Sequence, residues 1–489
     1  MAILKKSLRW LVNQPILALV FLMALALVVR LVWGWQVNSQ LNRRLALIRA
    51  ANQPTNVSEV IYPSIAASEN AWNLQMQASR ALAPNIKSPG NMEGETFAYP
   101  LSDPHWLTLA ERSETAHAPA FVLARQARGK SDVLIRSTLP SPVMNIILSY
   151  INDAKELACT LIDGAIYSHL KHNDDEAIER LLDALHIARS FYHDDFPLCQ
   201  MVGAGFEGRV CAATRIIFSD FRPGDRSRIP AKTSQLIAQL QDEQLLNTGF
   251  ARGLMFEQLI WIDYYADRAS KNWLLRPLAE REIVRMLANC ELLRQAAQSP
   301  FYPQAQQFLK RLPKEPPPPR FGPMGLEIHD RSIPRFSRWF HYTSDQSRNL
   351  RYYFRILAER RSTVVALAVH FYRLDHGRWP AQLADLVPTY LTALPIDPFT
   401  EDGRPIGYLI SNLPNGTQRP LLFFEAGSEV PIPAEPTYLS YPAAWNAPDV
   451  RQYRDLSYFD PSLLKKTVND HPEKSDAPGN NPQQPNKRN

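Results

Sequence analysis

The longest apolar run in the chain lies near the N-terminus, from Pro15 to Trp35, and Arg30 is the one charged residue within it. A helix of about 20 apolar residues crosses the roughly 30 Å hydrocarbon core of a bilayer. Tryptophans flank the run on both sides, as in the aromatic belts at the two membrane interfaces. The pattern predicts a single transmembrane helix at residues 15–35, continued by a helical stalk over residues 36–49.

A cleaved signal peptide is the rival explanation, because Lys5 and Lys6 belong to a basic segment before the run. Cleavage needs small residues directly after the apolar core, whereas Trp33 and Trp35 stand there. We therefore favour an uncleaved anchor. Basic residues flank the run on both sides, so the positive-inside rule gives little direction. Since a very short N-terminal tail usually stays cytoplasmic, we place the body in a periplasm-like space outside a bacterial inner membrane.

Through the middle of the chain, apolar residues recur at spacings of three and four, which is the period of an amphipathic helix. The segments with this period are residues 68–82, 104–128, 147–165, 178–192, 198–218, 233–246, 252–269 and 278–298. Polar breaks at 172–175 and 194–197 make the central helices antiparallel neighbours. The string from His169 to Arg189 resembles one tetratricopeptide unit, but no second copy follows at a fixed period. We predict a repeat-like antiparallel helical bundle over residues 141–312.

A proline-rich segment, Pro313 to Pro319, follows this helical middle. Such segments are semi-rigid connectors, so the strongest candidate domain boundary lies here. After it, the spacing predicts a helix over residues 348–375 with Gly377 as its left-handed C-cap. Shorter elements follow: a helix from Trp379 and strands at 406–410 and 421–424, joined through the turn residues Asn415 and Gly416.

The C-terminal module has an ordered string of distinctive residues between positions 361 and 410. They are Leu374, Asp375, Gly377, Trp379, Pro380, Leu394, Pro395, Asp397, Pro398, Phe399, Pro405 and Tyr408. This string resembles the globular part of the major pseudopilins of type II secretion, in which a helix, a short helix and a small sheet follow one another. The whole chain is also similar to bacterial envelope proteins of unknown activity that have an N-terminal anchor and a helical middle. The resemblance implies a small α+β module and offers a role in a secretion system.

The chain departs from the pseudopilin pattern in two respects. Pseudopilins have their apolar helix directly in front of this module, behind a prepilin-peptidase site, whereas the anchor here lies far upstream without that site. The family's calcium-binding loop is replaced by the segment from Glu425 to Glu429. We therefore carry over neither calcium binding nor assembly into a pilus-like polymer.

Composition narrows the function classes only a little. The 489 residues have 54 Lys and Arg against 48 Asp and Glu, a formal charge of +6 without a compact basic block, so we predict no nucleic-acid binding. The four cysteines, which include Cys159 and Cys199, form no C-x-x-C pair, so a zinc or redox motif is not expected. A disulfide between Cys159 and Cys199 is possible in an oxidising compartment, but we favour buried free thiols.

The segment Gly203 to Gly208 fits the G-x-G-x-x-G motif of dinucleotide-binding proteins. That motif needs a preceding strand and a βαβ unit, whereas the flanking segments here have the helical period. Small residues in a helix also allow close packing against a neighbour. We therefore interpret these glycines as packing positions.

Two clusters of polar residues are candidates for chemistry. The first comprises His169, His172, Asp174 and Asp175, with His186 and His193 one helix away; we interpret it as a polar turn rather than a metal site. The second comprises Glu257, Asp263 and Asp267 beside Trp261, Tyr264 and Tyr265, which could line a saccharide cleft. An amphipathic helix with an aromatic core face is the commoner case, and we favour it.

We predict a mainly α fold with an N-terminal transmembrane helix, an antiparallel helical bundle and a small α+β pseudopilin-like module. The predicted regions are a cytoplasmic tail 1–14, an anchor 15–35, a stalk and irregular helical region 36–140, a bundle 141–312, a Pro-rich linker 313–345, the module 346–440 and a disordered tail 441–489. No catalytic, cofactor-binding or metal-binding residue is assigned.

For function we expect a single-pass inner-membrane protein of the bacterial envelope that serves as a protein-interaction or assembly scaffold. The alternatives are a pseudopilin-like secretion component and a hydrolase of envelope polymers. The expected partners are the lipid bilayer, through residues 15–35, and other proteins.

Overall fold

A computed structural model describes residues 15–89, 104–143, 146, 148–218, 221, 230–271, 273, 276–312, 346–412 and 418–424. In this part of the chain the protein is mainly helical and has one N-terminal apolar helix, as the sequence predicts. The predicted tail 1–14, the linker 313–345, the turn at Asn415 and Gly416, and the tail 441–489 lie outside the described residues.

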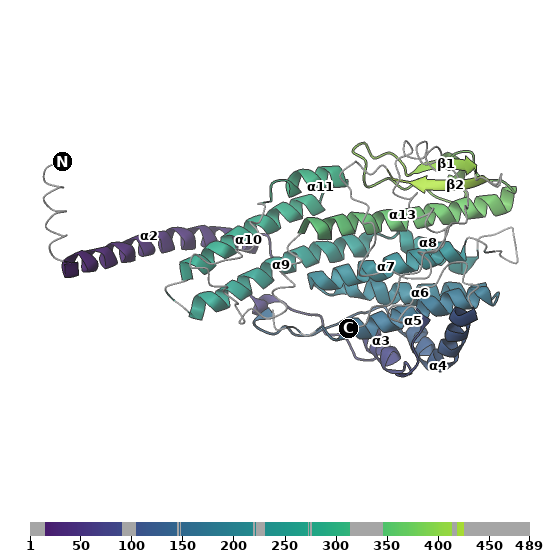
Figure 1. Ribbon diagram of the computed structural model, residues 1–489, viewed down its shortest axis with the longest axis horizontal. Coiled ribbons are helices and arrows are strands. Elements are labelled where there is room, and N and C mark those ends of the chain that lie inside the picture. The colour runs from purple at the N-terminus through teal and green to yellow at the C-terminus, as the bar shows by residue number, and fades with distance from the viewer. Residues whose placement is uncertain are drawn as a thin grey trace, which may run out of the picture.

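The N-terminal helix α2 (Pro15–Ala50) projects from one end of the molecule (Figure 1). Pro15 suits the first turn of a helix, where its missing N–H would have no partner. The helix is long and apolar enough to cross a membrane, and its apolar side chains are exposed; Ile16, for example, is 77% exposed. It continues without interruption through the predicted stalk, which confirms that the stalk is helical.

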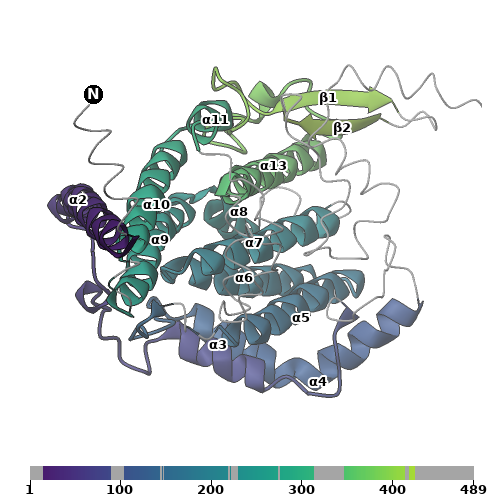
Figure 2. The ribbon, with the colours of Figure 1, turned by 60° about the vertical axis from the view of Figure 1, so that its left-hand side comes forward.

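The helices after α2 stack in layers from α4 to α13 (Figure 2). The first are α3 (Ala71–Arg80), α4 (Pro104–Arg128), α5 (Tyr150–Leu170), α6 (Asp174–Ser190) and α7 (Pro197–Ile217), with the 3-10 helices η1 (Val57–Glu59) before α3 and η4 (Phe191–His193) before α7. The turn between α5 and α6 forms where expected: His172 has a positive φ of 61°, and the Asn173 side chain accepts a hydrogen bond from the Glu176 N–H at 3.3 Å. That bond satisfies one of the unpaired N–H groups at the start of α6.

A second group of helices follows this stack in the chain and precedes the C-terminal module. It comprises α8 (Ala231–Gln241), α9 (Gln244–Lys271), α10 (Arg276–Ala297) and α11 (Tyr302–Leu309). The helices α9 and α10 form a long hairpin beside α2, and α10 packs against α2 through a small apolar cluster of Leu41, Ile262, Ile283 and Leu287. The body is therefore joined to α2 by side-chain packing as well as by the chain.

The C-terminal module begins with α13 (Gln346–His376) and ends in an antiparallel pair of strands. Gly377 has a φ of +69°, which confirms the predicted left-handed C-cap. The short 3-10 helix η5 (Leu383–Leu386) follows, and then β1 (Gly407–Asn412) pairs with β2 (Gln418–Phe423) so that Leu409 faces Leu421. One hydrophobic core runs continuously from α3 through α7 to α13 and the module.

Two predicted element boundaries are wrong. The helix predicted from residue 68 begins instead at Ala71, because Asn70 is its N-cap: the Asn70 side chain accepts hydrogen bonds from the N–H groups of Trp72 at 3.1 Å and Leu134 at 3.0 Å. The break between α8 and α9 comes several residues earlier than predicted, because the Asp242 carboxylate accepts a hydrogen bond from the N–H of Gln244 and starts the next helix there.

Candidate binding pocket

The G-x-G-x-x-G segment lies within α7, preceded by α6 and the short helix η4. A Cβ atom added at Gly203 would stand 2.7 Å from the carbonyl oxygen of Ala188. Gly203 therefore lets α7 approach the backbone of α6, which is the packing role expected for it. The buried helical setting has no strand-to-helix turn on which a pyrophosphate could rest.

The histidine and aspartate cluster forms a helix cap. The Nδ1 atom of His169 lies 2.6 Å from the Oδ1 atom of Asp174 across the turn between α5 and α6. Among the described residues, no group of three His, Cys, Asp or Glu side chains is placed to hold a metal ion. Burial lowers the pKa of His186 to about 4, with the nearby Arg128 guanidinium as the second cause, so this imidazole is neutral near pH 7.

Glu257 and Asp263 on α9 do not converge. Glu257 is buried, and its Oε1 atom lies 3.5 Å from the indole Nε1 of Trp261. Asp263 is six residues further on, on a different face of the helix, where it accepts hydrogen bonds from the N–H of Val143 at 2.7 Å and the hydroxyl of Ser141 at 3.2 Å. Asp267 shares the face of Asp263. Glu257 and Asp263 are thus held by different surroundings and do not face each other as the paired carboxylates of a glycoside hydrolase do.

All four cysteines are buried free thiols. Cys159 and Cys199 therefore form no disulfide, as we favoured from the sequence. Burial raises the pKa of Cys199 well above its usual range, and the charge of Asp194 raises it further. The hydroxyl of Tyr150 lies 3.3 Å from the Cys199 sulfur. A protonated thiol of this kind is a poor nucleophile, so the geometry does not support cysteine catalysis.

A pocket of about 450 Å³ lies where the α9–α10 hairpin meets α11 and α13. Pockets that hold small ligands or side chains of a partner span about 300–1,000 Å³, so this size is adequate. Most of its wall is apolar or aromatic. The lining residues are Glu243, Asn247, Phe250, Ala251, Leu254, Arg294, Ala297, Gln298, Ser299, Pro300, Phe301, Tyr353, Phe354, Leu357, Arg361 and Ile396.

Aromatic packing shapes one wall of the pocket. The rings of Phe250 and Tyr353 stack with their centroids 4.5 Å apart and an interplanar angle of 19°. The Tyr353 hydroxyl donates a hydrogen bond of 2.6 Å to the side-chain oxygen of Asn247. Burial raises the pKa of Tyr353 to about 12, and the Glu243 charge adds to this, so the phenol stays protonated at neutral pH. The wall is therefore rigid and neutral.

The charged groups of the pocket are paired with one another. Arg361 holds the Glu243 carboxylate through two hydrogen bonds of 2.7 Å, and its Nη1 atom donates to the carbonyl of Ile396 at 2.9 Å. Arg294 pairs with Glu291, one turn away on α10. A ligand in the pocket would meet apolar surface and satisfied polar groups, which suits a binding site better than a catalytic one.

Arg360, the residue before Arg361 on α13, is not among the residues that line the pocket. Arg360 points into the helical stack and donates hydrogen bonds to the carbonyls of Leu240 at 3.0 Å, Gln239 at 3.0 Å and Asp242 at 2.6 Å. These carbonyls end α8 and have no partner within that helix. The two consecutive arginines on α13 therefore have different roles: Arg360 holds α13 against α8, and Arg361 forms part of the pocket wall.

Local sequence patterns do not reveal this pocket. Its residues come from the three helices α9, α10 and α13, from the connection between α10 and α11, and from the loop at Ile396, and none of them forms a local motif. The sequence features that could have pointed to the pocket, two consecutive arginines in α13 and Phe250 in α9, are common in helices and weakly informative. Comparison with family models, curated proteins and solved structures finds no match to the chain.

Proposed function

We propose that this chain is a single-pass membrane protein of the bacterial envelope that holds a partner protein, a scaffold whose body stands on the membrane. The pocket between α9, α10, α11 and α13 would receive an apolar segment of that partner. The observation that carries the proposal is the position of α10. Its first turns pack against α2, and its last turn lines the pocket through Arg294 and Ala297. One rigid helix of about 33 Å therefore connects the membrane anchor to the binding site.

The chemistry of the described residues supports binding over catalysis. The pocket has paired charges, a protonated phenol and stacked aromatic rings, and Glu257 and Asp263 on α9 do not face each other. We also propose that the antiparallel pair α5 and α6 is a tetratricopeptide-like unit within a helical bundle. The body would lie on the periplasmic side of an inner membrane, because a short N-terminal tail usually stays in the cytoplasm.

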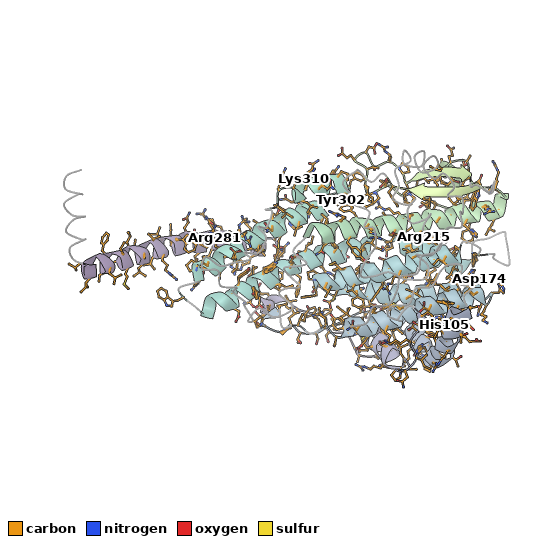
Figure 3. All side chains as sticks on the ribbon, in the orientation of Figure 1. His105, Asp174, Arg215, Arg281, Tyr302 and Lys310 are labelled. Carbon is orange, nitrogen blue, oxygen red and sulfur yellow. The ribbon has the colours of Figure 1, made fainter. Side chains whose placement is uncertain are left out.

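Site-specific photo-crosslinking in the cells that make the protein tests this function. Ala251 is exposed at the rim of the pocket, so we would replace it with a photoreactive phenylalanine analogue. His105 at the far end of the body receives the same group as the control position (Figure 3). We expect a discrete protein adduct from position 251 that is absent from position 105 and is lost when Leu254→Arg places a charge in the pocket. Identical adducts from both positions, or none from 251, would contradict the proposal.

A pseudopilin-like secretion component is the second candidate. The order of elements in the module favours it: a long helix, a glycine C-cap at Gly377, a short 3-10 helix and an antiparallel hairpin. This candidate predicts removal of the N-terminal segment by a prepilin peptidase. Mass spectrometry of the protein from its own cells decides the matter, because an intact N-terminus is incompatible with that processing.

A further inference from the structure

The turn between α9 and α10 reaches the apolar part of α2. The guanidinium carbon of Arg30 lies 4.8 Å from the ring centroid of Trp273, and Arg30 also donates a hydrogen bond to the Trp273 carbonyl. A Cβ atom added at Gly34 would stand 3.3 Å from the Cγ atom of Pro277. The first residues of α10 therefore lie at the level of residues 30–34 of α2.

Further contacts show that α2 and α10 run parallel from this level. The Asn38 side-chain amide lies 3.4 Å from the Glu280 carboxylate, and Leu41 belongs to the same apolar cluster as Ile283. Each residue of α2 thus lies beside a residue of α10 about 242 positions later. The α9–α10 turn is the end of the body that points toward the N-terminal end of α2 (Figure 1).

This register fixes the depth of the turn if α2 crosses a bilayer. The apolar run ends at Trp35, and Arg30 is five residues, or about 7 Å, before that end. Trp273 and Pro277 would then lie where the hydrocarbon layer meets the headgroups. The body would not stand clear of the membrane on a stalk, because the hairpin would touch the bilayer beside the anchor.

The side chains at this level suit a membrane interface. Trp273 is 64% exposed, Trp35 is 76% exposed and Leu278 is 47% exposed, although large apolar residues are usually covered in a soluble body. Tryptophan prefers the headgroup level, where its ring meets hydrocarbon and its N–H meets water. Two segments distant in sequence thus supply one aromatic belt around the base of the body.

Basic side chains lie among these apolar residues and just above them. Arg276 and Arg281 are exposed on the first turns of α10, and Arg43 is exposed on α2. Figure 3 shows Arg281 where α2 and α10 meet. On the first turns of α10 the acidic groups are Glu280, which is buried and pairs with Arg276 at 2.7 Å, and Glu282, which pairs with Arg285. The exposed surface therefore carries an excess of positive charge, which attracts anionic headgroups.

We propose that the α9–α10 turn is a second membrane-contact element that places Trp273 and Leu278 in the bilayer interface and binds anionic phospholipid headgroups through Arg281 and Arg276. The inference rests on the proposed anchoring by α2 and adds a lipid partner to it. The contact would fix the tilt of the body, so that the pocket at the other end of α10 is held at a set height above the membrane.

Spin labels at three positions of the full-length chain in lipid nanodiscs test the contact. Leu278→Cys reports the turn and keeps Trp273 and both arginines, Leu22→Cys reports the apolar part of α2, and His105→Cys reports the far end of the body. The native cysteines are all buried, so the label goes to the introduced thiols. We expect the labels at 22 and 278 to be relaxed more strongly by oxygen than by a water-soluble nickel complex, and the label at 105 to show the reverse.

The three labels separate the two proposals. A label at 278 that the nickel complex relaxes as strongly as the label at 105, while the label at 22 stays immersed, overturns the membrane contact and leaves the anchor in place. A label at 22 that is open to the nickel complex overturns the anchor and the contact together.

A second comparison tests the lipid chemistry. Nanodiscs of neutral phosphatidylcholine are compared with nanodiscs that also contain phosphatidylglycerol. We expect the label at 278 to be less mobile when the anionic lipid is present, and we expect Arg281→Gln to remove this difference. Lys310→Gln makes the same change of charge at the C-cap of α11, away from the turn (Figure 3), and should leave the difference intact. Equal spectra in the two lipids would overturn the anionic-lipid part of the proposal.

Discussion

Arg360 on α13 and Glu207 on α7 form an ion pair in the core, with 2.7 Å between Nη1 and Oε1 and exposed fractions of 1% and 0% for the two side chains. The hydroxyl of Tyr192 donates a further hydrogen bond of 2.7 Å to the other oxygen of Glu207. The remaining N–H groups of Arg360 reach the end of α8. A charge on the first helix of the C-terminal module is therefore neutralised inside the helical stack.

We expect Arg360→Met to destabilise the protein by about 3–5 kcal/mol, because it leaves the Glu207 carboxylate buried without its partner. Urea unfolding of the detergent-solubilised chain measures the loss. Arg404→Met is the matched control, since Arg404 pairs with Asp402 on the surface and its loss should cost less than about 1 kcal/mol. The double variant with Glu207→Leu should recover much of the stability. If Arg360→Met and Arg404→Met lowered the free energy of unfolding equally, the buried pair would not have the importance given to it.

The glycines of α7 give a second prediction. A Cβ atom at Gly203 meets the Ala188 carbonyl at 2.7 Å, whereas one at Gly208 meets the Cδ1 atom of Ile356 at 3.5 Å, an ordinary contact. Gly203→Ala should therefore cost about 1–3 kcal/mol through overpacking. Gly208→Ala should be neutral or stabilise by up to about 1 kcal/mol, because alanine favours a helix. Thermal unfolding compares them; equal losses from both, or binding of a dinucleotide by the unaltered chain, would contradict the packing role.

His186 gives a prediction about pH. Its pKa is lowered to about 4 by burial and by the charge of Arg128, while in the unfolded chain it is about 6.5. The folded state therefore binds fewer protons, and stability falls as pH decreases from about 6.5 to about 4. The loss is on the order of 2 kcal/mol. Asp183 has a pKa raised to about 6, so its contribution to stability increases as pH falls. To isolate the effect of the histidine, the unaltered chain is compared with His186→Asn.

The measurement is the free energy of unfolding at several pH values for both proteins. We expect the advantage of the unaltered chain over His186→Asn to shrink steadily below pH 6.5. A difference that stays constant between pH 7 and pH 4 would show that the imidazole does not change its protonation on unfolding.

Elements with a strong local signal are predictable from the sequence. The continuous helix from Pro15 through the stalk, the turn at His172 and the C-cap at Gly377 all follow from apolar periodicity or from backbone preference at a single residue. The boundaries that fail are those decided by long-range hydrogen bonds. Asn70 caps α3 while it also accepts a bond from the N–H of Leu134, 64 residues later, and a local pattern has no information about that partner.

The candidate pocket also cannot be predicted from local sequence patterns, because it too depends on long-range contacts. Its walls come together only when α13 packs on α7 and α8. That packing depends on the ion pair between Arg360 and Glu207, which are 153 positions apart in the chain. On the sequence alone Arg360 is one arginine among several in α13. The position of Trp273 beside α2 is likewise set by a contact between residues more than 240 positions apart.

Gly34 gives the last prediction, which concerns the junction of α2 and α10. A Cβ atom there would stand 3.3 Å from the Cγ atom of Pro277, so Gly34→Leu must push the start of α10 away from α2. Insertion of α2 into a membrane should not suffer, since leucine is favourable in hydrocarbon. Spin labels at Gln36 and Leu278, both exposed, report the separation. We expect a longer and broader distance distribution in Gly34→Leu, because the hairpin loses its contact.

The control is Val32→Leu, which adds bulk to the same stretch of α2 at a side chain that is 60% exposed. It should leave the distance between the labels unchanged, because an added methylene on this exposed side chain does not crowd the start of α10. A Gly34→Leu variant with the distance of the unaltered chain would show that α2 and α10 do not depend on this close approach. In that case the hairpin is held against α2 by its other contacts, such as the cluster around Leu41 and Ile283.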